Sequence, residues 1–208
     1  ADALIHRGTI ETDRLRPEQS PVGVAEQHLQ PDHLCARVVA GARVRAEGER
    51  RGIPSVVVTF DPHPVRVLHP ERAPELISPG PLHEDLLAET GIDGLLVIPF
   101  TWDYAQQSAE DFILSTFVRG LGVQALVVGA DTKGFGVGYT GDVDLIRQLG
   151  ADHGFEVVVL PDLGDDQRWS SSAVRAHLRA GEVADAAAVL GRAHRVVGTV
   201  VHGFHRGR

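Results

Sequence analysis

Cysteine and methionine are almost absent from this chain of 208 residues, which has one cysteine, Cys35, and no methionine. A single cysteine excludes an internal disulfide and favours a reducing compartment. The sequence also lacks any apolar run near the roughly 20 residues that a membrane helix needs, and its first residues contain no apolar signal-peptide core. We therefore expect a cytoplasmic protein that has no membrane partner.

Positive charge is scarce as well, because 20 lysines and arginines face 28 aspartates and glutamates, which leaves a formal net charge of −8. Broad binding to nucleic acid or to an acidic membrane normally needs a basic face, so this balance argues against both partners. A small anionic ligand is compatible with it, since a few backbone N–H groups and one or two cations hold a phosphate whatever the total charge. The length suits a domain with a sizeable core and says nothing of the oligomeric state.

Short apolar runs and amphipathic stretches alternate from Arg51 onward. Four runs rich in valine, leucine and isoleucine are expected to be strands, over residues 55–60, 94–99, 125–128 and 156–160. They are continuous rather than alternating, which is typical of parallel strands covered on both faces. Helical periodicity and capping residues predict helices over residues 36–51, 81–90, 108–119, 142–153, 171–180 and 183–190. This succession predicts an α/β fold with an open, doubly wound parallel sheet.

The last residues of the chain, VVGTVVHGFHRGR from 196 to 208, form a β-like run with two glycine turns. A lone strand cannot make a core of its own. The run therefore either packs on the sheet domain or is the first strand of a second domain.

Three segments follow predicted strands or open a predicted helix, where ligands of open α/β sheets bind. The first is FDPHP, residues 60–64, with three interpretations: a strand end, a metal site built on Asp61 and His63, or the lip of a ligand pocket. The second is the glycine-rich VVGADTKGFGVGYTGD, residues 127–142, for which a plain turn is the alternative. The third is RWSSSAVR, residues 168–175. Serines at a helix start are usually caps, but together with Arg175 they also make a good phosphate site.

These segments, joined by IPFTWDYAQQSAEDF and VLGRAHRVVGTVVHGFHRGR, resemble in their order the prokaryotic bifunctional riboflavin kinase/FMN adenylyltransferase family, also called FAD synthetase. The resemblance covers about residues 52–208. It implies a Rossmann-like nucleotidyltransferase domain over residues 1–190 that transfers AMP from ATP to FMN, with Mg²⁺, giving FAD and pyrophosphate. Residues 191–208 would be the start of a riboflavin kinase-like β-barrel. Riboflavin phosphorylation is not expected, because the family's P-T-A-N magnesium-binding segment is not in this sequence.

The resemblance also implies roles for single residues. The flavin side of the site would comprise Phe60, Asp61, Pro62, His63, Pro64, Asp131 and Phe135. ATP and its phosphates would be bound by His28, Gly129, Lys133, Ser170, Ser171, Ser172 and Arg175. Among the second group, His28, Ser171 and Arg175 are expected to act on the reaction itself. No metal ligand from the protein is implied, since Mg²⁺ would arrive with ATP.

The chain departs from the family pattern near its first strand. Where the family has G-x-F-D-G-V-H-x-G-H, residues 23–31 read GVAEQHLQP, which keeps His28 and places Pro31 at the second histidine. Residues 16–21 before it are polar and twice broken by proline, which makes a poor strand. Losing one preorganised donor typically lowers a rate by about 10²–10³-fold. We expect an FMN adenylyltransferase, active or impaired. The alternatives are a non-catalytic flavin- or nucleotide-binding remnant of the same fold and a nucleotidyltransferase with another acceptor.

Overall fold

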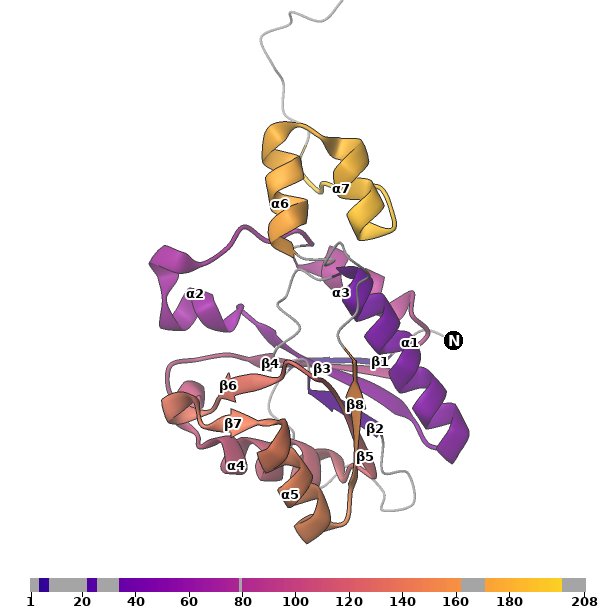
Figure 1. Cartoon of the computed structure of the whole chain (residues 1–208), viewed down its shortest axis with the longest axis vertical. Helices are drawn as coiled ribbons and strands as arrows, with labels where there is room; N and C mark the ends of the chain where they lie inside the picture. Colours follow the sequence, from indigo (N-terminus) through magenta and orange to yellow (C-terminus); the bar gives the residue numbers. More distant parts are fainter. Residues whose placement is uncertain (1–3, 8–21, 26–33, 79, 162–170, 200–208) are drawn as a thin grey trace, which may run out of the picture.

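The structure is a computed structural model that describes residues 4–7, 22–25, 34–78, 80–161 and 171–199. Its centre is a sheet of six parallel strands in the order β1-β4-β3-β2-β5-β8 (Figure 1). The strands are β1 (Leu4–Arg7), β2 (Val22–Ala25), β3 (Ser55–Asp61), β4 (Gly94–Pro99), β5 (Ala125–Gly129) and β8 (Glu156–Leu160). The chain runs outward from β2 in one direction through β3 and β4, and in the other through β5 and β8. The prediction of a doubly wound parallel sheet is confirmed.

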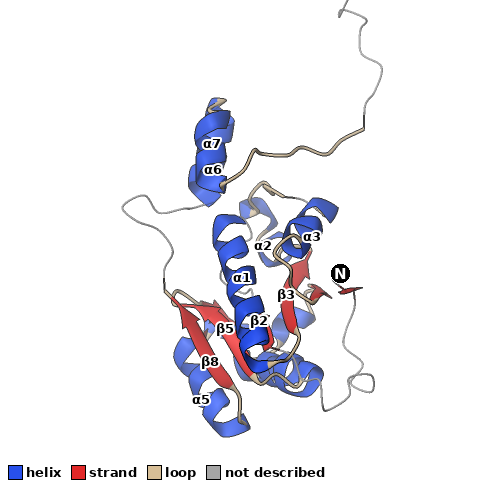
Figure 2. Ribbon diagram, turned by 90° about the vertical axis from the view of Figure 1, so that its right-hand side faces the viewer, coloured by secondary structure: helices blue, strands red, loops and turns tan. Residues whose placement is uncertain are grey.

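Helices cover both faces of this sheet. One face carries α1 (Leu34–Arg51) and α3 (Pro81–Ala88), and the other carries α4 (Ala109–Phe112), the π-helix η5 (Ile113–Leu121) and α5 (Val143–His153). Neighbouring residues of a strand point to opposite faces. Ala125 and Val127 of β5 accordingly pack with Val44 of α1, whereas Leu126 and Val128 pack in a larger cluster with residues of η5 and α5. Figure 2 shows α1 and α5 on opposite sides of β5 and β8.

The predicted helix over residues 108–119 begins as expected and then changes type. Ser108 is the N-cap of α4, and its hydroxyl accepts a hydrogen bond from the Asp111 amide at 2.9 Å. After Phe112 the chain continues as the π-helix η5 and ends at Gly122, which has a left-handed φ of 60°. The helical position was therefore predicted correctly, but the π-helical winding was not.

The last two helices, α6 (Ser171–Ala180) and α7 (Val183–Leu190), have the bounds that the sequence predicts. They form a hairpin whose apolar side packs on α3 and on the segment before it, through Val174, Ala186, Leu190, Ile77, Leu82 and Leu86. Figure 1 shows this hairpin beyond the edge of the sheet. Residues 193–199 form no helix or strand, so the β-like run predicted there is not a strand in its described part, and residues 200–208 lie outside it.

Two strands near the N-terminus correct the sequence interpretation. β1 was not predicted, and it pairs with β4 at the edge of the sheet. β2 contains Gly23, which the resemblance assigned to a phosphate-binding motif after the first strand. It begins directly after Pro21 and pairs with β3 and β5. A four-residue strand flanked by polar residues lacks the long apolar run by which the other strands were found.

None of the helices in the described ranges has the length and apolar character needed to cross a bilayer.

Candidate functional site

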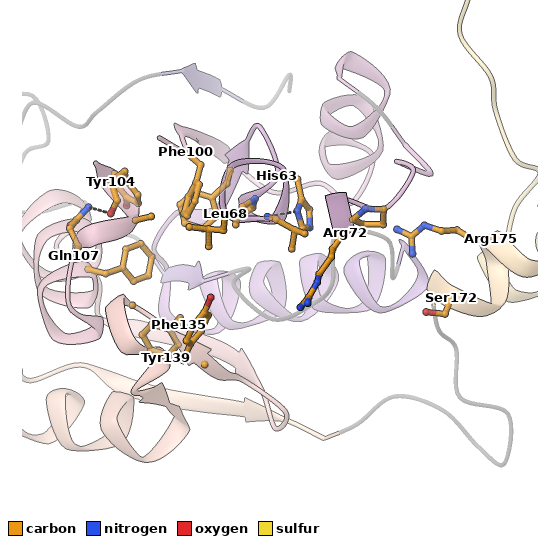
Figure 3. Close-up of a pocket in the computed structure, with 18 residues that line it drawn as sticks. His63, Leu68, Arg72, Phe100, Tyr104, Gln107, Phe135, Tyr139, Ser172 and Arg175 are labelled. Atoms are coloured by element: carbon orange, nitrogen blue, oxygen red, sulfur yellow. Dashed lines mark hydrogen bonds between the residues drawn. The ribbon is translucent and has the colours of Figure 1, made fainter. Parts of the chain in front are cut away.

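A cavity of about 500 Å³ lies beyond the carboxyl ends of β3 and β4. Part of the segment 60–74 forms one wall, and this segment includes α2 (Pro64–Leu68) and the 3₁₀ turn η3 (Pro70–Arg72). The opposite wall is formed by Gly134, Phe135, Gly136 and Tyr139. They belong to the hairpin of β6 (Lys133–Phe135) and β7 (Gly141–Asp142), which η6 (Val137–Tyr139) joins. The site is therefore where open α/β sheets bind ligands. Figure 3 shows the side chains that line it.

Aromatic rings form one end of the cavity. Phe60 lies at the centre, with ring centroids 5.2 Å from Phe100, 5.9 Å from Tyr104 and 6.0 Å from Phe112. Phe135 meets Phe112 edge to face at 6.2 Å. Tilted and edge-to-face packing of this kind stabilises rings relative to one another. This end is thus a preformed apolar surface that suits a planar aromatic ligand.

The π-helix η5 supports the polar groups of this aromatic end. The hydroxyl groups of Tyr104 and the buried Thr116 form a hydrogen bond of 3.3 Å, and the Ser115 hydroxyl donates to Gln107 Oε1 at 3.4 Å. Burial raises the pKa of Tyr104, against the effect of its bonds with Thr116 and Gln107. Tyr104 is accordingly a neutral donor or acceptor at neutral pH. Short π-helical segments are frequent at functional sites.

The FDPHP segment joins the strand to the cavity wall. β3 extends to Asp61, and Pro64 is the first residue of α2, where its fixed φ suits a helix start. His63 Nδ1 accepts a hydrogen bond from the Val65 amide at 2.9 Å and so caps this helix. Phe60, His63 and Pro64 line the cavity, whereas Asp61 lines a smaller neighbouring one of about 60 Å³. The pocket-lip interpretation therefore fits best.

Cationic groups mark the other end of the cavity. Arg175 and Ser172 reach it from α6, and Arg72 reaches it from η3 (Figure 3). Arg175 is only 8% exposed, and its Nε donates to the Glu75 carbonyl at 2.8 Å. Burial, and after it the charge of Arg179, lowers the pKa of Arg175. A buried guanidinium beside a helix N-terminus is a favourable place for a phosphate group.

Ser171, the first residue of α6, is completely buried next to this cationic end. Its hydroxyl oxygen has no hydrogen-bond partner among the described residues. A buried polar atom without a partner costs free energy, and such atoms often mark functional positions. Of the predicted group, Ser171, Ser172 and Arg175 all lie in the first two turns of α6, and their role in binding phosphate stays a prediction.

Four further predicted site residues do not line the cavity. Gly129 is the last residue of β5, while Asp131 and Lys133 are exposed, and none of the three lines the cavity. Pro62 is exposed and lines neither of the two cavities. His28 and Ser170 lie outside the described residues. The roles implied for these residues stay predictions.

Several lining residues were given no role from the sequence. They are Leu68, Arg72, Phe100, Tyr104, Gln107 and Tyr139. Phe100, Tyr104 and Gln107 fall in the FTWDYAQQ stretch that supported the resemblance, and a predicted strand ends just before it. Its aromatic content after a strand end was the signal that could have identified it.

One group of potential metal ligands occurs in the described part of the chain. His177, Glu182 and Asp185 lie at the turn between α6 and α7, with their ligand atoms within 4.8 Å of one another. His177 Nδ1 and Glu182 Oε2 already form a hydrogen bond of 2.7 Å. Asp61 and His63 belong to no such group, so the metal interpretation of FDPHP receives no support there.

Comparison with known proteins gives consistent relatives. A family model described as FAD synthetase matches residues 37–174. The bifunctional riboflavin kinase/FMN adenylyltransferase of Escherichia coli (strain K12) is 34% identical over 168 residues, which covers 79% of this chain and 53% of that protein. The protein of the same name from Bacillus subtilis (strain 168) is 31% identical over 199 residues, which covers 93% of this chain and 61% of that protein. The chain thus spans between about half and three fifths of these relatives.

Among solved structures, the crystal structure of a macrolide-efflux protein from Streptococcus pneumoniae resembles this chain with a TM-score of 0.79. The two are 22% identical, and the match covers 98% of this chain and 65% of the other. At this identity the likeness concerns the fold, and it agrees with the α/β architecture described above.

Proposed function

Because the chain belongs to the FAD synthetase family, we propose that its cavity binds FMN and that the protein transfers AMP from ATP to the FMN phosphate. The observation that carries the proposal is the division of one cavity into an aromatic and a cationic end. FMN has the same division, since a planar isoalloxazine ring is joined by a ribityl chain to a phosphate. The relatives of similar sequence bear the name FMN adenylyltransferase.

In this proposal the isoalloxazine ring occupies the aromatic end, beside Phe60 and Phe100. Its polar edge meets the Gln107 amide and the Tyr104 hydroxyl, which gives orientation to a mainly apolar contact. The phosphate extends toward Arg175, Ser172 and Arg72 at the cationic end. Arg175 is well suited to bind it, because a guanidinium forms strong paired hydrogen bonds with phosphate oxygens.

The reaction that we propose needs no nucleophile from the protein. A phosphate oxygen of FMN attacks the α-phosphorus of ATP, a new P–O bond forms, and the bond to the β-phosphate oxygen breaks to release pyrophosphate. Catalysis then consists of holding the two phosphates in line and stabilising the charge on their oxygens. Arg175 would do so at neutral pH, since even with a lowered pKa a guanidinium stays protonated.

Magnesium fits this scheme as a companion of ATP. Among the described residues that line the cavity there is no aspartate or glutamate, so the protein offers few oxygen ligands to a hard cation there. The triphosphate itself supplies such ligands. We propose that Mg²⁺ enters as the ATP complex and that Arg72 and Arg175 balance the remaining negative charge.

The test is an assay of the purified chain with FMN, ATP and MgCl₂, in which FAD and pyrophosphate are measured together. Formation of both in equal amounts is the expected result. No product above the buffer rate at high protein concentration would exclude the reaction. Replacing FMN by other phosphorylated acceptors tests whether FMN is preferred, and equal turnover of unrelated acceptors would favour another nucleotidyltransferase.

A second candidate function is binding of the flavin without turnover. It is favoured by the position of Gly129 and Lys133, which are implied to bind ATP but lie outside the cavity, and by the altered motif at residues 23–31. Isothermal titration calorimetry separates the two functions. Tight binding of FMN with no FAD formation would support this candidate, and measurable turnover would exclude it.

A further inference from the structure

Tyr139 occupies a backbone conformation that tyrosine rarely adopts. Its φ is +58°, and no other non-glycine residue in the described ranges has a positive φ. Gly136 and Gly138 in the same turn have φ values of 74° and 75°, which glycine adopts without strain. A tyrosine at such a position is disfavoured relative to glycine. Residues in such disfavoured conformations cluster at functional sites, which points to a functional role for the Tyr139 side chain.

The ring of Tyr139 lies at the mouth of the cavity. It is one of the lining residues, next to Phe135 and across from Leu68 and His63 (Figure 3). Its hydroxyl group forms a hydrogen bond of 3.4 Å with Nε2 of His69, the residue that follows α2. The residue is nevertheless 62% exposed. One side of the ring thus faces the cavity and much of the rest faces solvent, while the hydroxyl joins the two walls.

The turn over residues 136–139 is held against neighbouring backbone at its start, which limits where the Tyr139 ring can lie. A Cβ atom at Gly136 would lie 2.3 Å from the Ala109 amide nitrogen, which means that the turn is pressed against the start of α4. The Val137 amide donates to the Gln107 carbonyl at 2.7 Å. Gln107 also lines the cavity. The turn is therefore attached to the cavity wall on one side, and Tyr139 projects from it over the opening.

We propose that Tyr139 is a retaining residue of the cavity, whose ring covers a bound flavin at the mouth and whose bridge to His69 slows its release. The inference rests on the proposed function, because it takes the occupant to be FMN. A ring that stacks on an aromatic ligand contributes to affinity beyond the area that it buries. The preorganised bridge would act mainly on the dissociation rate, as most changes within one binding site do.

The test compares Tyr139→Gly, Tyr139→Phe and the wild type by stopped-flow dissociation of FMN, by FMN affinity from flavin fluorescence, and by Tm. In Tyr139→Gly, FMN should dissociate about 3- to 10-fold faster, because the ring is lost. Its Tm should stay level or rise by about 2–4 °C, because glycine relieves the positive φ. Tyr139→Phe keeps the ring and loses the bridge, and should accelerate release by about 2- to 3-fold.

Val137→Ala is the matched control. Val137 is an exposed apolar residue of the same turn that does not line the cavity, so FMN release from this variant should equal that of the wild type. Unchanged FMN release in Tyr139→Gly would overturn the inference, and so would a lowered Tm that accompanies weaker binding, since both point to a structural role. A wild-type chain that binds no FMN would overturn the proposed function and, with it, this inference.

Discussion

At the amino edge of the sheet, where β3 and β8 begin, charged side chains pair with one another. At the carboxyl edge, where β3 and β4 end, the cavity has the buried Ser171 hydroxyl beside it and the strained Tyr139 backbone at its mouth. Glu47 at the amino edge is almost fully buried and pairs with Arg43, Arg50 and Arg51. Among the described residues, the charge of Glu47 is thus balanced within the protein, whereas the buried Ser171 hydroxyl beside the cavity has no hydrogen-bond partner.

Together with the proposed function, this difference predicts that stability and binding are separated along the strands. Variants at the amino edge should lower the free energy of unfolding and leave FMN affinity unchanged. Variants at the carboxyl edge should change binding more than stability. Each of the following experiments can contradict that separation, because both quantities are measured on every variant.

Replacing Arg175 by alanine should have the largest effect. With the cation lost at the phosphate end, FAD formation should fall by about 10²–10³-fold. FMN affinity should fall by about 10- to 100-fold, since hydrogen bonds to charged groups are strong. Riboflavin has no phosphate, so its affinity should be nearly unchanged, and this ligand pair is measured by flavin fluorescence.

Arg179→Ala is the control for this variant. Arg179 lies on the same helix and pairs with Glu75 at 3.0 Å, but it is exposed and does not line the cavity. Its loss should leave both affinities as they are. Equal losses of FMN and riboflavin affinity in Arg175→Ala would show that Arg175 supports the fold and does not bind the phosphate.

Replacing Glu47 by glutamine should have the largest effect on stability. The side chain of Glu47 is 8% exposed, and that of Arg51 is 12% exposed. Without the charge of Glu47, Arg51 keeps Glu156 as its one acidic partner among the described residues. Removing one charge of a buried ion pair leaves the other less well compensated, so urea unfolding at pH 7 should show a loss of about 2–4 kcal/mol. FMN affinity should not change.

The pH dependence of the Glu47 variant follows from its pKa. Burial acts to raise the pKa of Glu47, but hydrogen bonds from Arg51 and Arg50 outweigh it and the pKa is lowered. The contribution of the Glu47 charge to the free energy of unfolding is therefore fully present above the unfolded pKa of about 4.3. It is lost as the pH falls through the lower folded pKa. Glu49→Gln is the control, because this exposed residue pairs with Arg45 alone among the described residues. A pH-independent difference from wild type would contradict the account.

The regular elements of both edges were predictable because their signals are local. Apolar runs marked β3, β4, β5 and β8, and the Ser108 cap marked the start of α4. β1 and β2 were not predictable, because they are short and depend on pairing with β4, β3 and β5, which lie far along the chain.

The cavity was predictable only in part. Phe60, His63 and Arg175 were identified through motifs. That Arg72 and Arg175 line the same cavity depends on how α6 packs beside the segment before α3. Nothing in the sequence indicated that Tyr139 lines the cavity with a positive φ, because tyrosine rarely adopts this backbone conformation. Departures from local preference are expected at functional sites, and there sequence reasoning is least informative.

Thr116→Val tests whether the hydrogen bond between Thr116 and Tyr104 contributes to FMN binding or only to stability. Valine has nearly the same shape but loses the hydrogen bond with the Tyr104 hydroxyl at 3.3 Å. The loss should be about 1 kcal/mol in the free energy of unfolding. FMN affinity should fall by about 2- to 5-fold, because Tyr104 is then less well oriented. Unchanged affinity together with lower stability would assign Thr116 to the core alone.

Asp93→Asn should have the smallest effect on the free energy of unfolding among these variants. It tests whether a single exposed charge at the amino edge contributes to stability. Asp93 precedes β4, and its Oδ2 accepts hydrogen bonds from the Ser55 amide at 2.8 Å and from the Ser55 hydroxyl at 2.7 Å. The bond from the amide and then that from the hydroxyl lower the pKa of Asp93, against a smaller opposing effect of burial. Because the residue is exposed, the loss at pH 7 should be only about 0.5 kcal/mol after solvent screening.

The sign of the pH effect decides the interpretation of Asp93. A folded pKa below the unfolded value of about 3.9 means that the stabilisation is present above that pH and is lost as the pH falls through the folded pKa. The unfolding midpoints of the wild type and of Asp93→Asn should therefore differ at about pH 6 and converge as the pH falls through the folded pKa of Asp93. Asp85→Asn, at an exposed aspartate of α3, is the control for removing a surface charge. A difference that grows in acid would mean that the amino edge is not stabilised by the Asp93 charge, and a change in FMN affinity would mean that the two edges are coupled.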